Sequence, residues 1–228
     1  MVTRFAWCTA RPRLEVAVFI WLNLRSLRSR MAAPNDKMLW AEQTPRYRYG
    51  GAEVEVFAGA YRPKDGCATL TPVALPQDSW GANPEAELAI WVVHLQPGAS
   101  LVLPAAKLAE NQRTLYVFEG EGLKLGNQAV GGNKVVRVAA LQQLPMSNQG
   151  SAEVQILLMQ GVPIGEPVAA GGPFVMNTDA ELHQARVDFS RTRFGGCPWD
   201  SFEPTHGHGL QRFAQYPGEA EPELPPAA

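Results

Sequence analysis

The chain has 228 residues, of which 46% are hydrophobic and 18% charged, and its 22 acidic side chains nearly balance the 20 basic ones. An apolar fraction of this size can form a packed core, which excludes a globally disordered chain. The 21 glycines follow no three-residue period and the 19 prolines are scattered, which excludes collagen and coiled coils. The near-neutral charge argues against nucleic acid as the main ligand.

The first 37 residues are basic, with seven Lys and Arg against two acidic residues. A basic start followed by the apolar run 16–22 is superficially similar to a signal or transit peptide. The run is too short to span a bilayer, which needs about 20 apolar residues, and more arginines follow it. We therefore interpret it as a β-strand followed by a basic loop, and we expect no membrane association.

Short β-type segments separated by Gly and Pro follow from residue 50 onward. Segment 54–59 alternates with period two, 87–95 is apolar on both faces, and 113–119 is rich in aromatic and β-branched residues. Shorter segments of the same kind lie at 100–103, 123–125, 134–138, 142–144 and 153–160. Many short strands at intervals of about 8–12 residues predict an antiparallel sandwich or barrel.

One helix is predicted after Thr178. Thr178 and Glu181 have the spacing of a capping box, in which each side chain bonds a backbone N–H at the helix start. A narrow apolar stripe follows, formed by Leu182, Ala185 and Phe189. So narrow a stripe favours a lid over the barrel, and Gly195 and Gly196 are expected to end the helix. The acidic, proline-rich tail 216–228 is predicted to be disordered.

The four histidines decide whether a metal site is expected. A non-haem metal site on a β-barrel uses two or three imidazoles and a carboxylate from adjacent strands. His94 lies in an apolar strand, where a core or edge histidine is commoner than a ligand, and His183 is expected at the helix surface. His206 and His208 have HxH spacing, but Gly and Pro surround them just before the tail. His94, His206 and His208 are candidate ligands only, and we predict no metal site.

Nucleophilic catalysis has little support. Cys8, Cys67 and Cys197 are far apart and form no CxxC pair, which favours reduced thiols and a cytoplasmic protein. Cys197 follows the predicted helix, whose C-terminal dipole disfavours a thiolate, so we interpret it as structural. The chain contains no GxSxG, Walker or GxGxxG motif, and we predict no catalytic residue.

The most specific stretch is a Gly- and Pro-rich connection between the last barrel strand and the helix. A long ordered loop of this kind needs a reason, either contact with a substrate or clamping of two domains. Its signature residues are Gly161, Pro163, Ile164, Gly165, Glu166, Pro167, Gly172, Pro173, Phe174, Met176, Asn177 and Thr178.

These residues resemble the C-terminal half of the pirin family, which are bicupins with two jelly-roll barrels. The GxPIGEPV, GPFVMNT and FGxWPW signatures are similar to segments 161–168, 172–178 and 194–199, with Cys197 where the family has Trp. Segment 19–24 resembles the strand that closes the first cupin. The resemblance implies an all-β cupin barrel at 50–215 with one lid helix. Segment 19–49 is then a remnant strand and linker, and 1–18 is unassigned.

The resemblance also shows what this sequence lacks. Pirins hold their metal, usually iron, in the first cupin through three His and one Glu around an HPHRGFET-type segment. No such segment occurs here, and positions 101–120 contain no HxH pair. The resemblance therefore implies no cofactor bound by this chain, although iron serves the full-length family.

Three functions remain open. The first is a pirin-like cupin without the metal site, acting as a non-catalytic binding or regulatory module or representing a truncated pirin. The second is a quercetin 2,3-dioxygenase completed by a missing N-terminal cupin. The third is a protein-interaction scaffold that uses loop 165–177 and strand 16–24, whose unprotected edge predicts dimerisation or poor solubility. The partner is then an unknown protein, the missing cupin half or a second copy.

Overall fold

The computed structural model describes residues 5–6, 38–196, 212–214, 216 and 219–226. The chain divides into two compact units, with residues 1–42 and 165–228 in unit 1 and residues 43–164 in unit 2. The predicted cupin segment 50–215 thus includes most of unit 2 together with the helix of unit 1. The predicted remnant strand at 19–24 lies outside the described residues.

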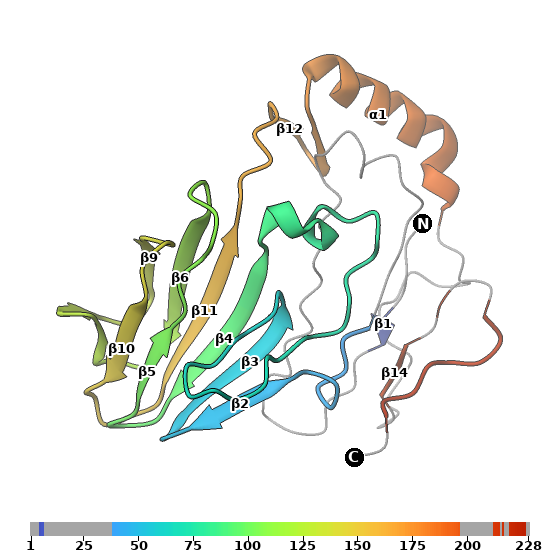
Figure 1. The fold of residues 1–228 in the computed structure, drawn as a ribbon. Helices are drawn as coiled ribbons and strands as arrows, with labels where there is room; N and C mark the ends of the chain where they lie inside the picture. The colour runs from blue at the N-terminus through green and yellow to red at the C-terminus, as the bar shows by residue number, and fades with distance from the viewer. Residues whose placement is uncertain (1–4, 7–37, 197–211, 215, 217–218, 227–228) are drawn as a thin grey trace. The chain divides into compact units, whose positions relative to one another are not determined.

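Unit 2 consists of two antiparallel sheets (Figure 1). The larger sheet has the order β2-β3-β4-β11-β6-β9, and the smaller one has the order β5-β10-β7-β8. The larger sheet contains β2 (Arg46–Tyr49), β3 (Ala52–Ala58), β4 (Ala89–Leu95), β11 (Val154–Gly161), β6 (Gln112–Glu119) and β9 (Lys134–Val138). The smaller contains β5 (Ser100–Leu103), β10 (Leu144–Asn148), β7 (Leu123–Leu125) and β8 (Gln128–Val130). The all-β architecture of antiparallel sheets predicted from the sequence is confirmed.

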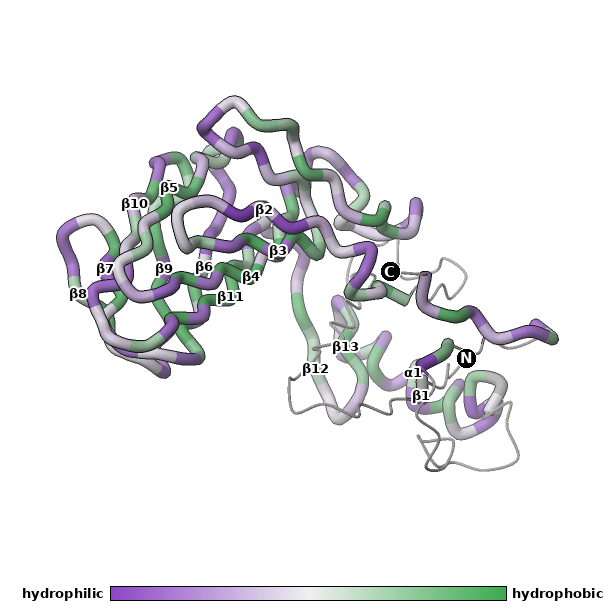
Figure 2. Tube along the Cα trace, turned by 90° about the horizontal axis from the view of Figure 1, so that it is seen from below, coloured by the Kyte–Doolittle hydropathy of each residue, from purple (hydrophilic) through white to green (hydrophobic). Residues whose placement is uncertain are grey.

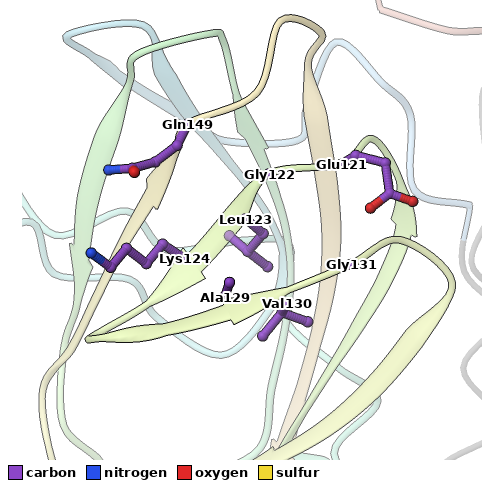
Figure 3. Close-up of a pocket in the computed structure, with 8 residues that line it drawn as sticks. All are labelled: Glu121, Gly122, Leu123, Lys124, Ala129, Val130, Gly131 and Gln149. Atoms are coloured by element: carbon purple, nitrogen blue, oxygen red, sulfur yellow. The ribbon is translucent and has the colours of Figure 1, made fainter.

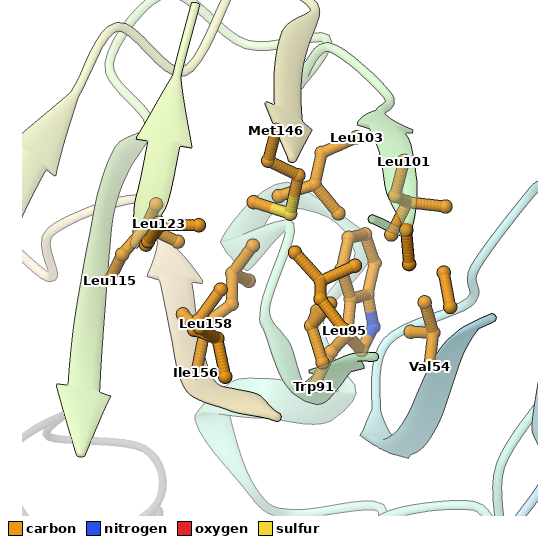
Figure 4. Close-up of a cluster of buried hydrophobic side chains, with 14 of the residues drawn as sticks. Val54, Trp91, Leu95, Leu101, Leu103, Leu115, Leu123, Met146, Ile156 and Leu158 are labelled. Atoms are coloured by element: carbon orange, nitrogen blue, oxygen red, sulfur yellow. The ribbon is translucent and has the colours of Figure 1, made fainter. Parts of the chain in front are cut away.

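The core of unit 2 lies between the two sheets. Alternate residues of the larger sheet point inward, so Trp91, Val93 and Leu95 of β4 are buried. They join one cluster with the inward residues of the smaller sheet, Leu101, Leu103, Leu123, Leu125 and Met146 (Figure 4). In the hydropathy tube, β4 and β11 are mainly hydrophobic and β2 is mainly hydrophilic (Figure 2). Burial of apolar surface in this cluster therefore holds the two sheets together.

The connection between β3 and β4 contains the short 3-10 helices η1 (Trp80–Ala82) and η2 (Pro84–Ala86). Ser79 and Asn83 cap them by accepting from the backbone N–H groups of Gly81 and Glu85. The connection ends at Glu87, whose φ of 41° lies in the left-handed region. This backbone conformation turns the chain into β4.

The predicted helix is α1 (Asp179–Thr192), and its capping box at Thr178 and Glu181 is confirmed. The helix packs against the hairpin of β12 (Ala169–Gly171) and β13 (Phe174–Met176), with Leu182 and Ala185 buried. It ends at Arg193 and continues as η3 (Arg193–Gly195). The hairpin lies in unit 1, and coverage of the barrel by this helix stays a prediction. No helix among the described residues is long and apolar enough to cross a bilayer.

Unit 1 also joins segments from both ends of the chain. β1 (Phe5–Ala6) pairs with β14 (Phe213–Ala214), and Ala214 forms a backbone bridge with Glu223. The Glu223 carboxylate accepts from Trp40 Nε1 at 2.6 Å and from the Tyr216 hydroxyl at 2.9 Å. The described part of the tail, which the sequence predicted to be disordered, therefore has defined contacts.

Substitution of Gly120, which follows the last residue of β6, tests how closely the backbone packs at this end of the strand. Its φ is +84°, and a Cβ there would overlap the backbone oxygen of Glu153. Gly126 in the β7–β8 turn has φ +55° but nothing within 4 Å of a Cβ. We expect Gly126→Ala to lower the free energy of unfolding by about 1–2 kcal/mol, the cost of a left-handed residue. Gly120→Ala should lower it further, and equal losses in urea denaturation would contradict this packing.

Candidate functional site

The interior of the barrel, where a cupin binds its ligand or metal, is filled with side chains. The inward positions of the strands hold apolar residues, with Arg113, Gln160 and Asn148 as buried polar exceptions. His94 is the only histidine in the described strands. The described residues therefore do not fit an iron centre inside this barrel, since no imidazoles converge there.

A buried polar layer lies at one end of the barrel. Arg113 is 1% exposed because it shares the inward face of β6 with Leu115 and Val117. Its Nε donates to Gln160 Oε1 at 2.7 Å, its Nη2 donates to the same oxygen, and its Nη1 donates to the carbonyl of Pro104 at 2.9 Å. Burial lowers the pKa of Arg113, whereas the nearby charge of Glu87 works to raise it.

Glu87 completes this layer from the β3–β4 connection. Its carboxylate accepts from the backbone N–H groups of Lys107 at 2.6 Å and Leu108 at 2.9 Å, and from Asn111 Nδ2 at 3.0 Å. Gln160 Nε2 donates to the carbonyl of Glu87 at 3.2 Å. The layer thus joins the β3–β4 and β5–β6 connections to the strands β6 and β11. This layer was not predicted from the sequence. Arg113 and Gln160 are nevertheless polar residues at the same two-residue spacing as the buried apolar residues of their strands.

His94 lies on the outer face of the larger sheet, away from the core. It alternates with the inward residues Val93 and Leu95, and its register partners are Glu53 on β3 and Gln155 on β11. His94 Nδ1 lies 3.1 Å from Glu153 Oε1. One imidazole and one carboxylate do not make a metal site, and among the described residues no three His, Cys, Asp or Glu side chains do so.

The other candidate residues do not meet His94 in the described part of the chain. His183 is exposed on α1, as the sequence predicted. His206, His208 and Cys197 lie outside the described residues. Cys67 is exposed, and its hydrogen bond with Asp65 raises the pKa of its thiol. A raised pKa makes this thiol a poorer nucleophile at neutral pH.

A shallow hollow of about 300 Å³ lies on the β7–β8 hairpin of the smaller sheet. Lys124 and Gln149 extend to one side of it, and Glu121 lies on the other (Figure 3). Glu121 Oε2 accepts from the backbone N–H of Gly132 at 2.9 Å. The remaining lining residues are Gly122, Leu123, Ala129, Val130 and Gly131. An ammonium and an amide beside apolar groups suit binding, but the hollow contains no nucleophile–base pair.

The signature loop is held to the start of α1 by hydrogen bonds. Asn177 Nδ2 donates to Glu166 Oε2 at 2.9 Å and to the carbonyl of Pro167 at 3.0 Å. The backbone N–H groups of Asn177 and Thr178 both donate to Glu181 Oε2 at 3.0 Å. These bonds lie within unit 1, so this part of the loop clamps its own hairpin and helix. Contact with a substrate stays a prediction.

Comparison with known proteins agrees with this architecture. Residues 90–195 match the family model of the pirin C-terminal cupin domain. Pirin-1 of Arabidopsis thaliana is 31% identical over 182 residues, which cover 77% of this chain and 57% of that protein. A Pseudomonas aeruginosa protein named as a quercetin 2,3-dioxygenase is 29% identical over 174 residues, covering 75% and 56%. The crystal structure of quercetin 2,3-dioxygenase from Acinetobacter baumannii has a TM-score of 0.59 at 23% identity, covering 73% and 53%.

The two packed sheets and the match to the family model define this barrel as a cupin domain. The chain is similar to pirins over about three quarters of its length, and its residues 90–195 match their C-terminal cupin domain. It spans a little over half the length of the curated relatives it matches. The activities and partners of those longer proteins are therefore a matter of proposal for this chain.

Glu153 should make the stability of unit 2 sensitive to acid. Burial works to raise its pKa, but hydrogen bonds with His94, Gln155 and Gln96 outweigh it and hold the pKa below the usual value. A pKa depressed by folding means that ionised Glu153 stabilises the fold at neutral pH. This contribution is lost as the pH falls from about 4.3, the unfolded-state pKa, through the folded-state value.

We expect Glu153→Gln to lower the free energy of unfolding at pH 7 by less than about 1 kcal/mol, since the site is partly exposed. The difference from the native chain should shrink between pH 5 and pH 3. Urea denaturation at each pH measures it, with Glu119→Gln on the exposed end of β6 as the matched control. A difference that does not change with pH would contradict the assignment.

Arg113→Met should destabilise the barrel, because it leaves Gln160 Oε1 and the Pro104 carbonyl without their donor. The expected loss of unfolding free energy is about 1–3 kcal/mol. Arg62→Met removes an exposed arginine of the same unit and should cost less than about 0.5 kcal/mol. Equal losses for the two variants in thermal or chemical denaturation would show that the polar layer is unimportant.

Proposed function

We propose that this chain acts as a pirin-type cupin module that binds a ligand or partner and carries out no metal-dependent oxidation by itself. The observation that supports the proposal is the use of the inward strand positions for packing. Where a metal-dependent cupin needs converging imidazoles, this barrel has Trp91, Leu115, Leu158 and their neighbours. Its polar layer is engaged in internal hydrogen bonds around Arg113.

The remaining donors favour binding over chemistry. Lys124 and Gln149 beside the hollow on β7–β8 can hold an anionic or carbonyl group, but neither has a base or nucleophile next to it. The buried Arg113 donates to internal acceptors, and it is not one of the residues that line the hollow. A regulatory or binding role needs only such a surface. We propose a cytoplasmic location on the basis of the three cysteines, which form no CxxC pair.

The second candidate is a quercetin 2,3-dioxygenase whose metal-bearing cupin comes from another polypeptide segment. It is favoured by the name of the Pseudomonas aeruginosa relative, of which this chain covers 56%. In that case the barrel supplies shape, and the iron and its ligands come with the other cupin. A third candidate is an interaction scaffold that uses loop 165–177, where Val168 is 53% exposed. Strand 16–24, the other part of that scaffold, lies outside the described residues.

Metal content tests the first candidate. The purified full chain, incubated with ferrous iron and desalted, should retain well below one equivalent of iron by mass spectrometry, because its barrel has no set of ligands. His94→Ala should leave that value unchanged. One equivalent of tightly held iron, reduced by His94→Ala or by the double variant His206→Ala/His208→Ala, would overturn the proposal.

Activity provides the complementary measurement. We expect no flavonol turnover by the chain alone. Turnover that appears only when the N-terminal cupin of a full-length pirin is added would favour the second candidate. No turnover in that mixture, with the added cupin shown to hold iron, would count against it.

A further inference from the structure

The outer face of the larger sheet contains an apolar row where a solvated sheet is expected to be polar. The register places Val92 of β4 beside Leu157 of β11, Leu157 beside Tyr116 of β6, and Tyr116 beside Val135 of β9. All four point away from the core, since they alternate with inward residues on their strands. We call Val92, Leu157, Tyr116 and Val135 the outer row.

Neighbouring side chains extend the outer row into a patch. Val135 is 65% exposed, Phe118 is 47% exposed and Met159 is 38% exposed. Met159 follows Leu157 by two residues on β11 and therefore lies on the same face. An antiparallel sheet with one free face normally alternates apolar and polar residues. Val92, Leu157 and Tyr116 are half-buried between these exposed side chains. Exposed apolar residues gathered on such a sheet mark an interaction surface.

The outward residues of β2 and β3, in the same sheet, differ in character from the outer row. On β2 and β3 the outward positions other than Phe57 are charged. Arg46 Nε lies 2.8 Å from Glu55 Oε1 and 3.4 Å from Glu53 Oε1. Arg48 pairs with Glu53. The change from charged to apolar residues occurs between β3 and β4, where Glu55 is the register partner of Val92. The partner surface therefore covers β4, β11, β6 and β9.

We propose that a second copy of this chain packs on the outer row, sheet against sheet. The charged residues at the two borders of the sheet are the reason for inferring a second copy as the partner. The β9 border has Arg137, which makes no ion pair within the described part of unit 2. The β2–β3 border has Glu53 and Glu55, whose carboxylates pair with Arg46 and Arg48 and retain lone pairs for a further guanidinium. A two-fold axis parallel to the strands brings each β9 border onto the β3 border of the other copy.

This arrangement covers the apolar part of the outer face and pairs charged residues at its borders. The outer rows of the two copies cover each other, with the sheets about 10 Å apart as in other face-to-face packings. Arg137 of each copy then meets Glu55 of the other, so the free cation gains an acceptor. A partner of different sequence need not provide this match. The inference is independent of whether the module binds a small ligand.

Sedimentation velocity on the full chain tests the proposal. At about 100 μM we expect a mass near twice the 24.8 kDa of one chain. Val135→Lys and Met159→Lys place charge in the outer row and should each shift the protein to the monomer mass. Leu141→Lys alters a side chain that is 51% exposed between β9 and β10, outside the row, and should leave the dimer intact. Circular dichroism verifies that each variant folds.

The border charges give a second test that does not depend on the apolar residues. Arg137→Glu should weaken the dimer, and the double variant Arg137→Glu/Glu55→Arg should restore it by exchanging the two charges. A monomeric native chain, a dimer that persists in both lysine variants, or a double variant no tighter than Arg137→Glu would overturn the proposal. Assembly beyond a dimer would also overturn it, because a two-fold sheet packing is closed.

Discussion

The larger sheet has two faces, and the strict alternation of side chains along its strands decides what this protein can do. Every second residue of β4, β6 and β11 is committed to the core between the sheets. A position used for packing is not available to bind a metal or substrate. The polar residues that do face inward, Arg113 and Gln160, hydrogen-bond each other and so join the packing. Function is therefore expected on the outer surfaces and loops.

The fold could be predicted because it depends on local sequence patterns. The site could not, because it depends on the register between strands. The short strands, the capping box at Thr178 and the surface position of His183 depend on residues close in sequence, and these expectations agree with the structure except at one strand. The strand expected at 142–144 lies instead at Leu144–Asn148. The face on which His94 lies depends on pairing with β3 and β11, and the register of β11 with β6 shifts at Gln155 and Ile156. A shift of one residue exchanges the two faces of a strand, so an apolar segment such as 87–95 cannot reveal which side holds its histidine.

The signature loop shows why resemblance succeeded where composition could not. Its recognisable residues are those whose chemistry is needed locally, such as the Glu166 carboxylate that accepts from Asn177 and the Glu181 carboxylate that accepts at the helix start. Such contacts tie a sequence motif to one backbone geometry. The Arg113 layer has no comparable motif, because Glu87, Asn111, Arg113 and Gln160 come from separate strands and connections.

The bond from Trp40 to Glu223 joins residues 183 positions apart and has a consequence for how the protein is made. Unit 2 is one continuous segment, so it can fold on the ribosome while the rest of the chain is still being translated. Unit 1 combines segments on both sides of unit 2, so the bond from Trp40 to Glu223 can form only after all of unit 2 has been translated. The barrel of unit 2 can therefore fold before the segments of unit 1 come together.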